Sequence, residues 1–212
     1  MNVRLDPVTF GSMIYSDWAE DLARTLLAEP LPRRWAHVQG VAAAARTLTP
    51  VMGGHTNLLT AAALLHDIGY APAVEVTGFH PLDGARYLRD VQQADGLLCR
   101  LVAHHSCALI EAEQWRLADE LSREFQPAPP DLADALTYCD MTTGPDGQPM
   151  TIEQRLADIR DRYGPEHLVT RALASSAPQL TEAAGRISRK LTACTAVPRR
   201  RRLVLALACQ PM

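Results

Sequence analysis

Lysine is almost missing from this chain of 212 residues, which has Lys190 and otherwise carries its positive charge on arginine. Aromatic residues are also scarce, at 5%, which argues against a surface that stacks nucleic-acid bases. The 21 basic and 24 acidic residues give a formal net charge of −3. This mild negative balance gives no electrostatic reason to expect a nucleic-acid partner.

The five cysteines never form a Cys-x-x-Cys pair and are odd in number, which argues against a disulfide scaffold or a thiolate zinc site. No apolar run approaches the roughly 20 residues of a membrane-spanning helix. No basic segment followed by an apolar one opens the chain, so we expect no signal peptide. These absences predict a soluble, cytoplasmic protein with no membrane partner. The 47% of hydrophobic residues is enough for a buried core.

Apolar residues recur at helical spacing along nearly the whole chain, and no strand alternation is visible. The pattern therefore predicts an all-α fold. Residues 58–65 are apolar all round, which predicts a helix buried at the centre of its domain. Thr151 is the expected N-cap of a later helix. Helices are predicted over residues 14–28, 33–48, from 56, 81–91, 94–104, 108–125, 131–142, from 151, 165–174 and 179–192, while 203–209 could be strand or helix.

We divide the chain into an N-terminal helical segment over residues 1–30 that packs on the core, a main domain over 31–165, and C-terminal helices with a basic tail over 166–212. The tail contains four consecutive arginines at residues 199–202. We interpret this run as a solvated segment, with binding to phosphates or an anionic membrane surface as the alternative.

Histidines and acids recur in a regular order on successive predicted helices. Imidazole and carboxylate together suit divalent Fe, Mn, Co, Ni and Zn. Asp67 lies at the end of the most apolar helix, where an ionised carboxylate is costly unless it is paired or binds a cation. The order is His37, the doublet His66-Asp67, His80, the doublet His104-His105, and Asp140.

This order, with Leu64-Leu65-His66-Asp67-Ile68-Gly69 around the first doublet, resembles the HD-domain superfamily of metal-dependent phosphohydrolases over roughly residues 33–160. The resemblance implies an all-helical bundle with the metal site buried between central helices. It also implies one or two divalent ions, of Fe, Mn, Co, Ni, Zn or Mg. The first ion would be bound by His37, His66, Asp67 and Asp140.

A second ion is implied by the additional histidines, with Asp67 bridging the two ions. His80, His104 and His105 match the positions of these extra ligands. Adjacent residues on a helix point about 100° apart, so both His104 and His105 can bind only at a helix end. If one of them is not a ligand, we expect His104 to be the one retained.

The resemblance predicts a phosphohydrolase, either a phosphomonoesterase or a phosphodiesterase, acting on a nucleotide or other small phosphate ester. Metal-bound hydroxide would be the nucleophile, with His66 and Asp67 as the catalytic residues. We expect Arg34, and after it Arg33, to contact the phosphate. Tyr70 stands where many relatives have Lys or His, so it is a substrate-binding candidate without positive charge.

Two other functions remain open. A mixed-valent di-iron oxygenase of the same superfamily, cleaving a C–C or C–P bond with O₂, would use the same ligands. A non-catalytic nucleotide-binding module is the third class. A small phosphorylated substrate is the expected partner, and a homodimer stays open.

Specificity is expected from loop 71–79, helix 108–125 and turn 142–149. Arg86 and Arg155 are further candidates to reach the cleft. Trp115 and Tyr138 could stack on a base, although core packing is the favoured role for both. His55 and His167 are expected at the surface.

Overall fold

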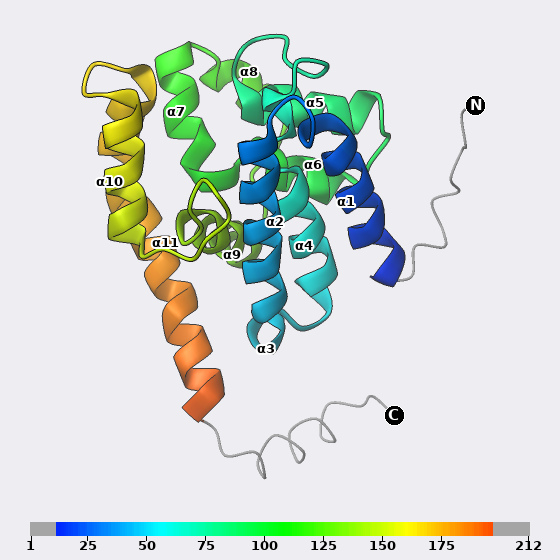
Figure 1. The fold of residues 1–212 in the computed structure, drawn as a ribbon, viewed down its shortest axis with the longest axis vertical. Coiled ribbons are helices and arrows are strands. Elements are labelled where there is room, and N and C mark those ends of the chain that lie inside the picture. The colour runs from blue at the N-terminus through cyan, green and yellow to red at the C-terminus, as the bar shows by residue number, and fades with distance from the viewer. Residues whose placement is uncertain (1–11, 197–212) are drawn as a thin grey trace.

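A computed structural model describes residues 12–196, with side chains from residue 15 onward. The arginines at 199–202 and the segment 203–209 lie outside these residues. The longer elements, shown in Figure 1, are α1 (Ser12–Leu27), α2 (Pro32–Thr47), α4 (Thr56–Leu65), α5 (His80–Asp90), α6 (Gly96–Ala103), α7 (Ala108–Trp115), α8 (Ala118–Glu124), α9 (Pro130–Met141), α10 (Ile152–Tyr163) and α11 (Leu168–Ala196).

Short helical elements connect several of these helices: α3 (Thr49–Met52), η1 (Gly53–His55), η2 (Ile68–Tyr70) and η3 (His105–Cys107). Residues 12–196 contain no β-strand, only an isolated bridge between Thr143 and Pro149. The predicted all-α fold is therefore confirmed. Within the same part of the chain, no helix combines the length and the apolar character needed to cross a bilayer.

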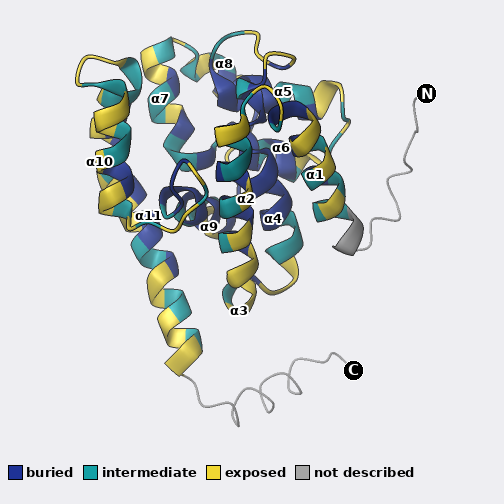
Figure 2. Ribbon diagram, in the orientation of Figure 1, coloured by how far each residue is buried: buried dark blue, intermediate teal, exposed yellow. Residues whose placement is uncertain are grey.

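Helix α4 lies at the centre of the bundle, as its uninterrupted apolar sequence predicted. Every residue from Leu59 to Leu65 is buried. Helices α1 and α2 pack along it, and α9 lies against α2, α4 and α11. Figure 2 shows α4 buried along most of its length, whereas the outer faces of α1 and α2 are exposed. The end of α4 therefore delivers its last residues into the interior.

Two predicted helix boundaries are wrong. The segment 108–125 is two helices rather than one, because Arg116 adopts a left-handed conformation (φ 58°) that ends α7 before α8 begins. The segments 165–174 and 179–192 belong to the single helix α11, which continues through Pro178. Packing of α11 on α7, α9 and α10 offsets the hydrogen bond that proline removes. Thr151 caps α10 with a capping box, as predicted.

The interior consists of a large apolar core and a smaller cluster. The large core is built from α1, α2, α4, α5, α6 and α9. The smaller cluster lies where α9, α10 and α11 meet, and its buried members are Met141, Leu156, Leu173 and Leu180.

Candidate metal centre

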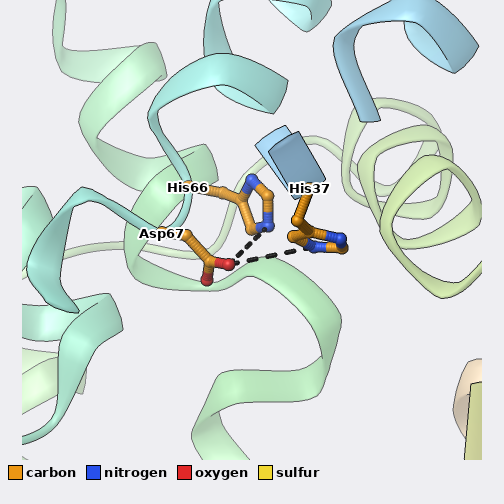
Figure 3. A group of neighbouring side chains, drawn as sticks. All are labelled: His37, His66 and Asp67. Carbon is orange, nitrogen blue, oxygen red and sulfur yellow. Dashed lines mark ion pairs between the residues drawn. The ribbon is translucent and has the colours of Figure 1, made fainter. Parts of the chain in front are cut away.

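Residues from three helices and two helix ends converge at the inner end of α4. His37 lies on α2, one turn beyond Arg33 and Arg34. His66 caps α4, and Asp67 follows it directly. Figure 3 shows the side chains of His37, His66 and Asp67 pointing toward one another from these elements. All three are at most 3% exposed, so the group is removed from bulk water.

The histidine rings are oriented by the main chain. In each of three rings Nδ1 lies within hydrogen-bond distance of a carbonyl oxygen, where it can only donate. The pairs are His37 with Gly144 (2.9 Å), His66 with Ala63 (2.8 Å) and His105 with Val102 (2.7 Å). In a neutral ring, Nε2 then carries no hydrogen, and its lone pair faces the site. Metal-binding histidines have the same arrangement, with one ring nitrogen bound to a hydrogen-bond acceptor and the other free to bind the metal.

Asp67 is shared between two groups of histidines. Its Oδ2 lies 3.4 Å from Nε2 of His66 and 3.8 Å from Nε2 of His37. Its Oδ1 lies 3.4 Å from Nε2 of His80 and 4.0 Å from Nε2 of His105. The two carboxylate oxygens therefore face separate sets of imidazole nitrogens. Each set, together with Asp67, has the donor types and spacing to hold a divalent cation.

Asp140, at the end of α9, joins the first of these groups. Its Oδ1 lies 3.1 Å from Nε2 of His37 and 3.8 Å from Nε2 of His66. Its other oxygen accepts a hydrogen bond from the Ser106 hydroxyl. Burial disfavours ionisation of Asp140, but the hydrogen bond from His37 and the nearby charges outweigh it and hold its pKa far below the usual value.

The donor set fits a metal because several buried atoms lack a suitable hydrogen. Nε2 of His66 is buried and makes no hydrogen bond to any residue that the structure describes. Nε2 of His80 and Nε2 of His105 lie 3.2 Å apart, although His105 already uses Nδ1 to bind a carbonyl. Nε2 of His105 then has no hydrogen, so the contact requires a hydrogen on Nε2 of His80 or a cation between the two atoms. Divalent ions at these positions would satisfy every one of these atoms.

The charges around the site also favour the protonation states that bind a cation. Burial alone would raise the pKa of Asp67, but Arg34 and the surrounding histidines hold it well below the usual value. Burial lowers the pKa of His80 far below its usual value and also lowers that of His105. The carboxylates are thus ionised and these two imidazoles neutral, which are the protonation states that bind metals.

The glycine two residues after Asp67, Gly69, is required by a close approach between two backbone segments. A Cβ atom at this position would lie 2.0 Å from the carbonyl oxygen of His80. The missing side chain lets η2 approach the start of α5 and places His80 beside Asp67. A similar close approach between Gly40 of α2 and the Gly147 backbone holds loop 144–149 against α2, where Gly144 accepts the His37 hydrogen bond.

His104 and His105 separate at the end of α6, and the preference for His104 is wrong. The helix stops at Ala103 and η3 begins at His105, which confirms the expected helix end. His105 turns toward Asp67, whereas Nε2 of His104 lies 2.7 Å from the carbonyl oxygen of Phe125. Ser106, in a left-handed conformation (φ 47°), reverses the chain directly after the pair. The structure therefore brings His105, and not His104, into the group.

Arg34 and Tyr70 lie at the edge of the metal cluster. The Arg34 Nη1 atom donates to Oδ2 of Asp67 at 2.7 Å, and its guanidinium lies 4.1 Å from the centre of the Tyr70 ring. On its other face Tyr70 stacks on His80, with ring centres 4.0 Å apart and planes at 16°. Tyr70 is thus held between a cation and an imidazole, and burial raises the pKa of its phenol well above the usual value.

Two arginines point elsewhere. Arg33, expected next to the phosphate, donates to Asp146 in an exposed ion pair and does not line the cleft. It turns outward because adjacent helical residues face directions about 100° apart. Arg86 pairs with Glu120 and Glu124 of α8 and does not line the cleft. His55 and His167 are exposed, as expected.

A cleft of about 100 Å³ leads from the metal cluster toward α10 and α11. Arg155, a candidate from the sequence, lines this cleft, and so do two charged side chains that the sequence did not indicate, Glu111 and Arg162. Arg155 is buried, and its Nη2 lies 3.9 Å from Oδ1 of Asp140. Burial, reinforced by the charge of Asp67, raises the pKa of Glu111 to about 7.

Of the regions expected to set specificity, only one lines the cleft. Helix α7 contributes Glu111, as the 108–125 segment predicted, but loop 71–79 and turn 142–149 do not line the cleft. Helices α10 and α11 line the cleft instead. The spacing of their apolar residues was the sequence signal that could have indicated a buried face on each helix. Trp115 and Tyr138 pack against the large core, in agreement with the favoured role for both.

Comparison with known protein families matches residues 34–165 to the HD domain. No curated protein and no solved structure matches the chain. The family match covers more than half of the sequence and includes every residue of the metal cluster. The protein belongs to the HD-domain family.

Proposed function

We propose that this protein is a metal-dependent phosphohydrolase that acts on a small phosphate ester with two divalent ions. The observation that carries the proposal is the position of Asp67, whose two oxygens face two separate groups of imidazole nitrogens. A carboxylate shared in this way is the expected bridge of a two-ion site.

The ligands divide into two sets around that carboxylate. His37, His66, Asp67 and Asp140 would hold one ion, and Asp67, His80 and His105 the other. When bound, divalent ions supply Lewis acidity at the phosphoryl group and a water-derived nucleophile at neutral pH. His66 and Asp67 are the catalytic residues of this proposal because both lie at the centre of the cluster.

Two arginines are positioned to bind the phosphoryl oxygens. Arg34 uses Nη1 on Asp67 and retains further N–H donors at the cleft. Arg155 lines the same cleft, and its buried Nε makes no hydrogen bond to any described residue. A phosphate between them would give these donors acceptors and would offset the positive charge.

Glu111 and Tyr70 provide the polar groups near the leaving oxygen. Burial and the charge of Asp67 raise the pKa of Glu111 in the metal-free protein, and Glu111 is the carboxyl group that we assign as proton donor to the departing alkoxide. This donation would replace the charge that Lys or His supplies in many relatives. Tyr70, which stays protonated, contributes a neutral hydrogen-bond donor.

The test compares metal content and phosphate release in the purified protein. We expect two ions per chain by elemental analysis and release of inorganic phosphate from a panel of phosphomonoesters and phosphodiesters. His66→Ala should lose metal and reduce the rate on the order of 10³-fold. His55→Ala, a histidine at the exposed end of the bundle, is the matched control and should leave both measurements unchanged.

A different outcome would select the oxygenase. Two irons per chain, substrate-dependent O₂ consumption and no phosphate release from any ester would replace hydrolysis with oxidative bond cleavage at the same ligands. Phosphate release with manganese under anaerobic conditions would exclude that alternative.

A further inference from the structure

The cleft beside the metal cluster has two chemically different ends. At the inner end lie the charged groups described above, including Arg34, Asp67 and Arg155. Apolar side chains from the ends of α9, α10 and α11 form much of the rest of the lining: Met141, Ile159, Val169, Ala172, Leu173 and Leu180. Arg162 and Tyr163, at the end of α10, also line the cleft. Any molecule that fills the whole cleft must therefore present a charged group at one end and apolar surface at the other.

One face of α11 forms most of this apolar wall. Val169, Ala172, Leu173, Ser176 and Leu180 follow the spacing of three and four that places residues on one side of a helix. Leu173 and Leu180 of this wall belong to the smaller apolar cluster, and none of the wall residues belongs to the large core. It also lies beyond residue 165, where the HD-domain match ends, so it is a feature of this chain's own C-terminal helix.

The wall offers little to a nucleobase. The hydroxyl of Ser176 donates within α11, to the carbonyl of Leu173 at 3.4 Å. Among the described residues, no asparagine or glutamine side chain lines the cleft. A base placed against this wall would lose hydrogen bonds to water without gaining replacements, whereas an apolar group would lose none.

The cleft volume limits the size of that apolar group. The whole cleft, including the end beside the metal cluster, has a volume of about 100 Å³, smaller than the roughly 150 Å³ apolar cavity that binds benzene, so only part of it is left for the apolar group. We infer that the substrate is a phosphomonoester of a short apolar alcohol, with its phosphate at the metal cluster and a few carbon atoms against Val169, Ala172 and Leu173. This inference rests on the proposed function for the position of the phosphate.

Alkylphosphonates test this inference without hydrolysis. Binding of methyl-, ethyl-, propyl-, butyl- and hexylphosphonate to the metal-loaded protein is measured by titration calorimetry. We expect affinity to rise about fourfold per methylene, the gain from removing apolar surface from water, and to stop rising near four carbons. Equal Kd values for methyl- and butylphosphonate, or tighter binding of adenosine 5′-monophosphate than of butylphosphonate, would overturn the inference.

Two neighbouring alanines on α11 provide matched variants. Ala172 is buried in the wall, whereas Ala174 is exposed. Ala172→Leu should fill the cleft and weaken butylphosphonate binding at least tenfold while leaving methylphosphonate unchanged. Ala174→Leu should bind every phosphonate as the wild type does. If Ala172→Leu unfolds, the isosteric Val169→Thr should instead reduce the gain per methylene, with Val91→Thr at an exposed site as its control.

Hydrolysis of the corresponding alkyl phosphates separates the two proposals. Phosphate release with no dependence on chain length refutes the apolar substrate and leaves the phosphohydrolase intact. Binding that increases with chain length, without phosphate release from any ester, supports the apolar wall and refutes the phosphohydrolase. No phosphonate binding and no phosphate release would refute both.

Discussion

The two sides of the cleft are built in different ways. The metal side consists of charged groups held over the large core, by helices whose inward residues are almost all fully buried. The opposite side is the face of α11 over a cluster with four buried members. Figure 1 shows α11 running along the edge of the bundle and past it, away from the central α4. The proposed metal centre thus lies over the large core, whereas the proposed apolar wall lies over the smaller cluster.

The difference extends to individual side chains. On the metal side, three of the imidazoles are oriented by carbonyl groups and Asp67 is held by Arg34. On the α11 side, Leu173 and Leu180 are placed by packing alone. A reactive group must be positioned within a fraction of an ångström, whereas an apolar wall requires only shape and volume. The comparison predicts that substitutions on the two sides will have different consequences.

The largest effect on activity is expected on the metal side, from a substitution of the shared carboxylate of Asp67. Asp67→Asn removes the charge that both groups of histidines share and should reduce phosphate release on the order of 10³-fold, with loss of metal. Elemental analysis and a phosphate assay measure the two losses. Asp146→Asn, which affects the exposed pair with Arg33, is the control. A fully active Asp67→Asn protein with two ions would contradict the bridging role.

The next effect concerns stability and compares the two apolar clusters directly. Leu64 and Leu180 are each 1% exposed, the first in the large core and the second in the smaller cluster. Leu64→Ala should lower the free energy of unfolding by about 4 kcal/mol and Leu180→Ala by about 2 kcal/mol, because α11 can relax into the space. Urea titration measures both. Equal losses would show that the two sides are equally rigid.

A smaller effect distinguishes the adjacent histidines. His105→Ala should cost one metal ion per chain and about 30-fold in rate, the range typical of groups that support a metal site. His104→Ala, with its ring on the Phe125 carbonyl, should retain both ions and stay within about twofold of the wild-type rate. If His104→Ala loses the ion instead, the assignment of the second group is wrong.

The smallest expected effect is a change in the pH dependence of stability, and it concerns Glu111, which lies where the two sides of the cleft meet. Its carboxyl group has a pKa of about 7 in the folded protein, raised by burial from an ordinary value of 4.5. The folded chain therefore holds this proton more tightly than the unfolded chain. The resulting stability is complete below pH 4.5 and is lost as pH rises through 7.

Removing the charge tests this linkage. In chelator-treated protein, Glu111→Gln should match the wild type at pH 4.5 and exceed its free energy of unfolding by about 1 kcal/mol at pH 8. Urea titrations across this range measure the difference. Glu113→Gln, on the exposed side of the same helix, should follow the wild type at every pH. Parallel curves for Glu111→Gln and Glu113→Gln would refute the raised pKa.

Much of the metal side could be predicted because its signals are local. The apolar run of α4 predicts burial, and a buried Asp67 is costly unless it is paired or binds a cation. Gly69 is required where η2 meets His80. The α11 side could not be predicted in the same way, because its residues are ordinary apolar ones whose neighbours lie far away in the sequence. Pro178 also suggested a break that tertiary packing prevents.

Two pairs of adjacent residues show most clearly what could not be predicted from the sequence. Arg33 and Arg34 are chemically alike, as are His104 and His105, and in each pair one member faces the site. Which member does so depends on the rotation of α2 and on the left-handed turn at Ser106. Neither is encoded in residue type or spacing.

The sequence by itself determined an all-α chain and a buried central helix, because helix periodicity acts locally, and its resemblance to the HD-domain superfamily supplied a candidate set of imidazole and carboxylate ligands. The tertiary structure decided that His105 and not His104 joins Asp67, that Arg155 and Glu111 reach the cleft, and that α11 forms its apolar wall. These outcomes depend on how helices distant in the sequence are rotated and packed against one another, and packing selects that rotation from contacts that no single segment contains.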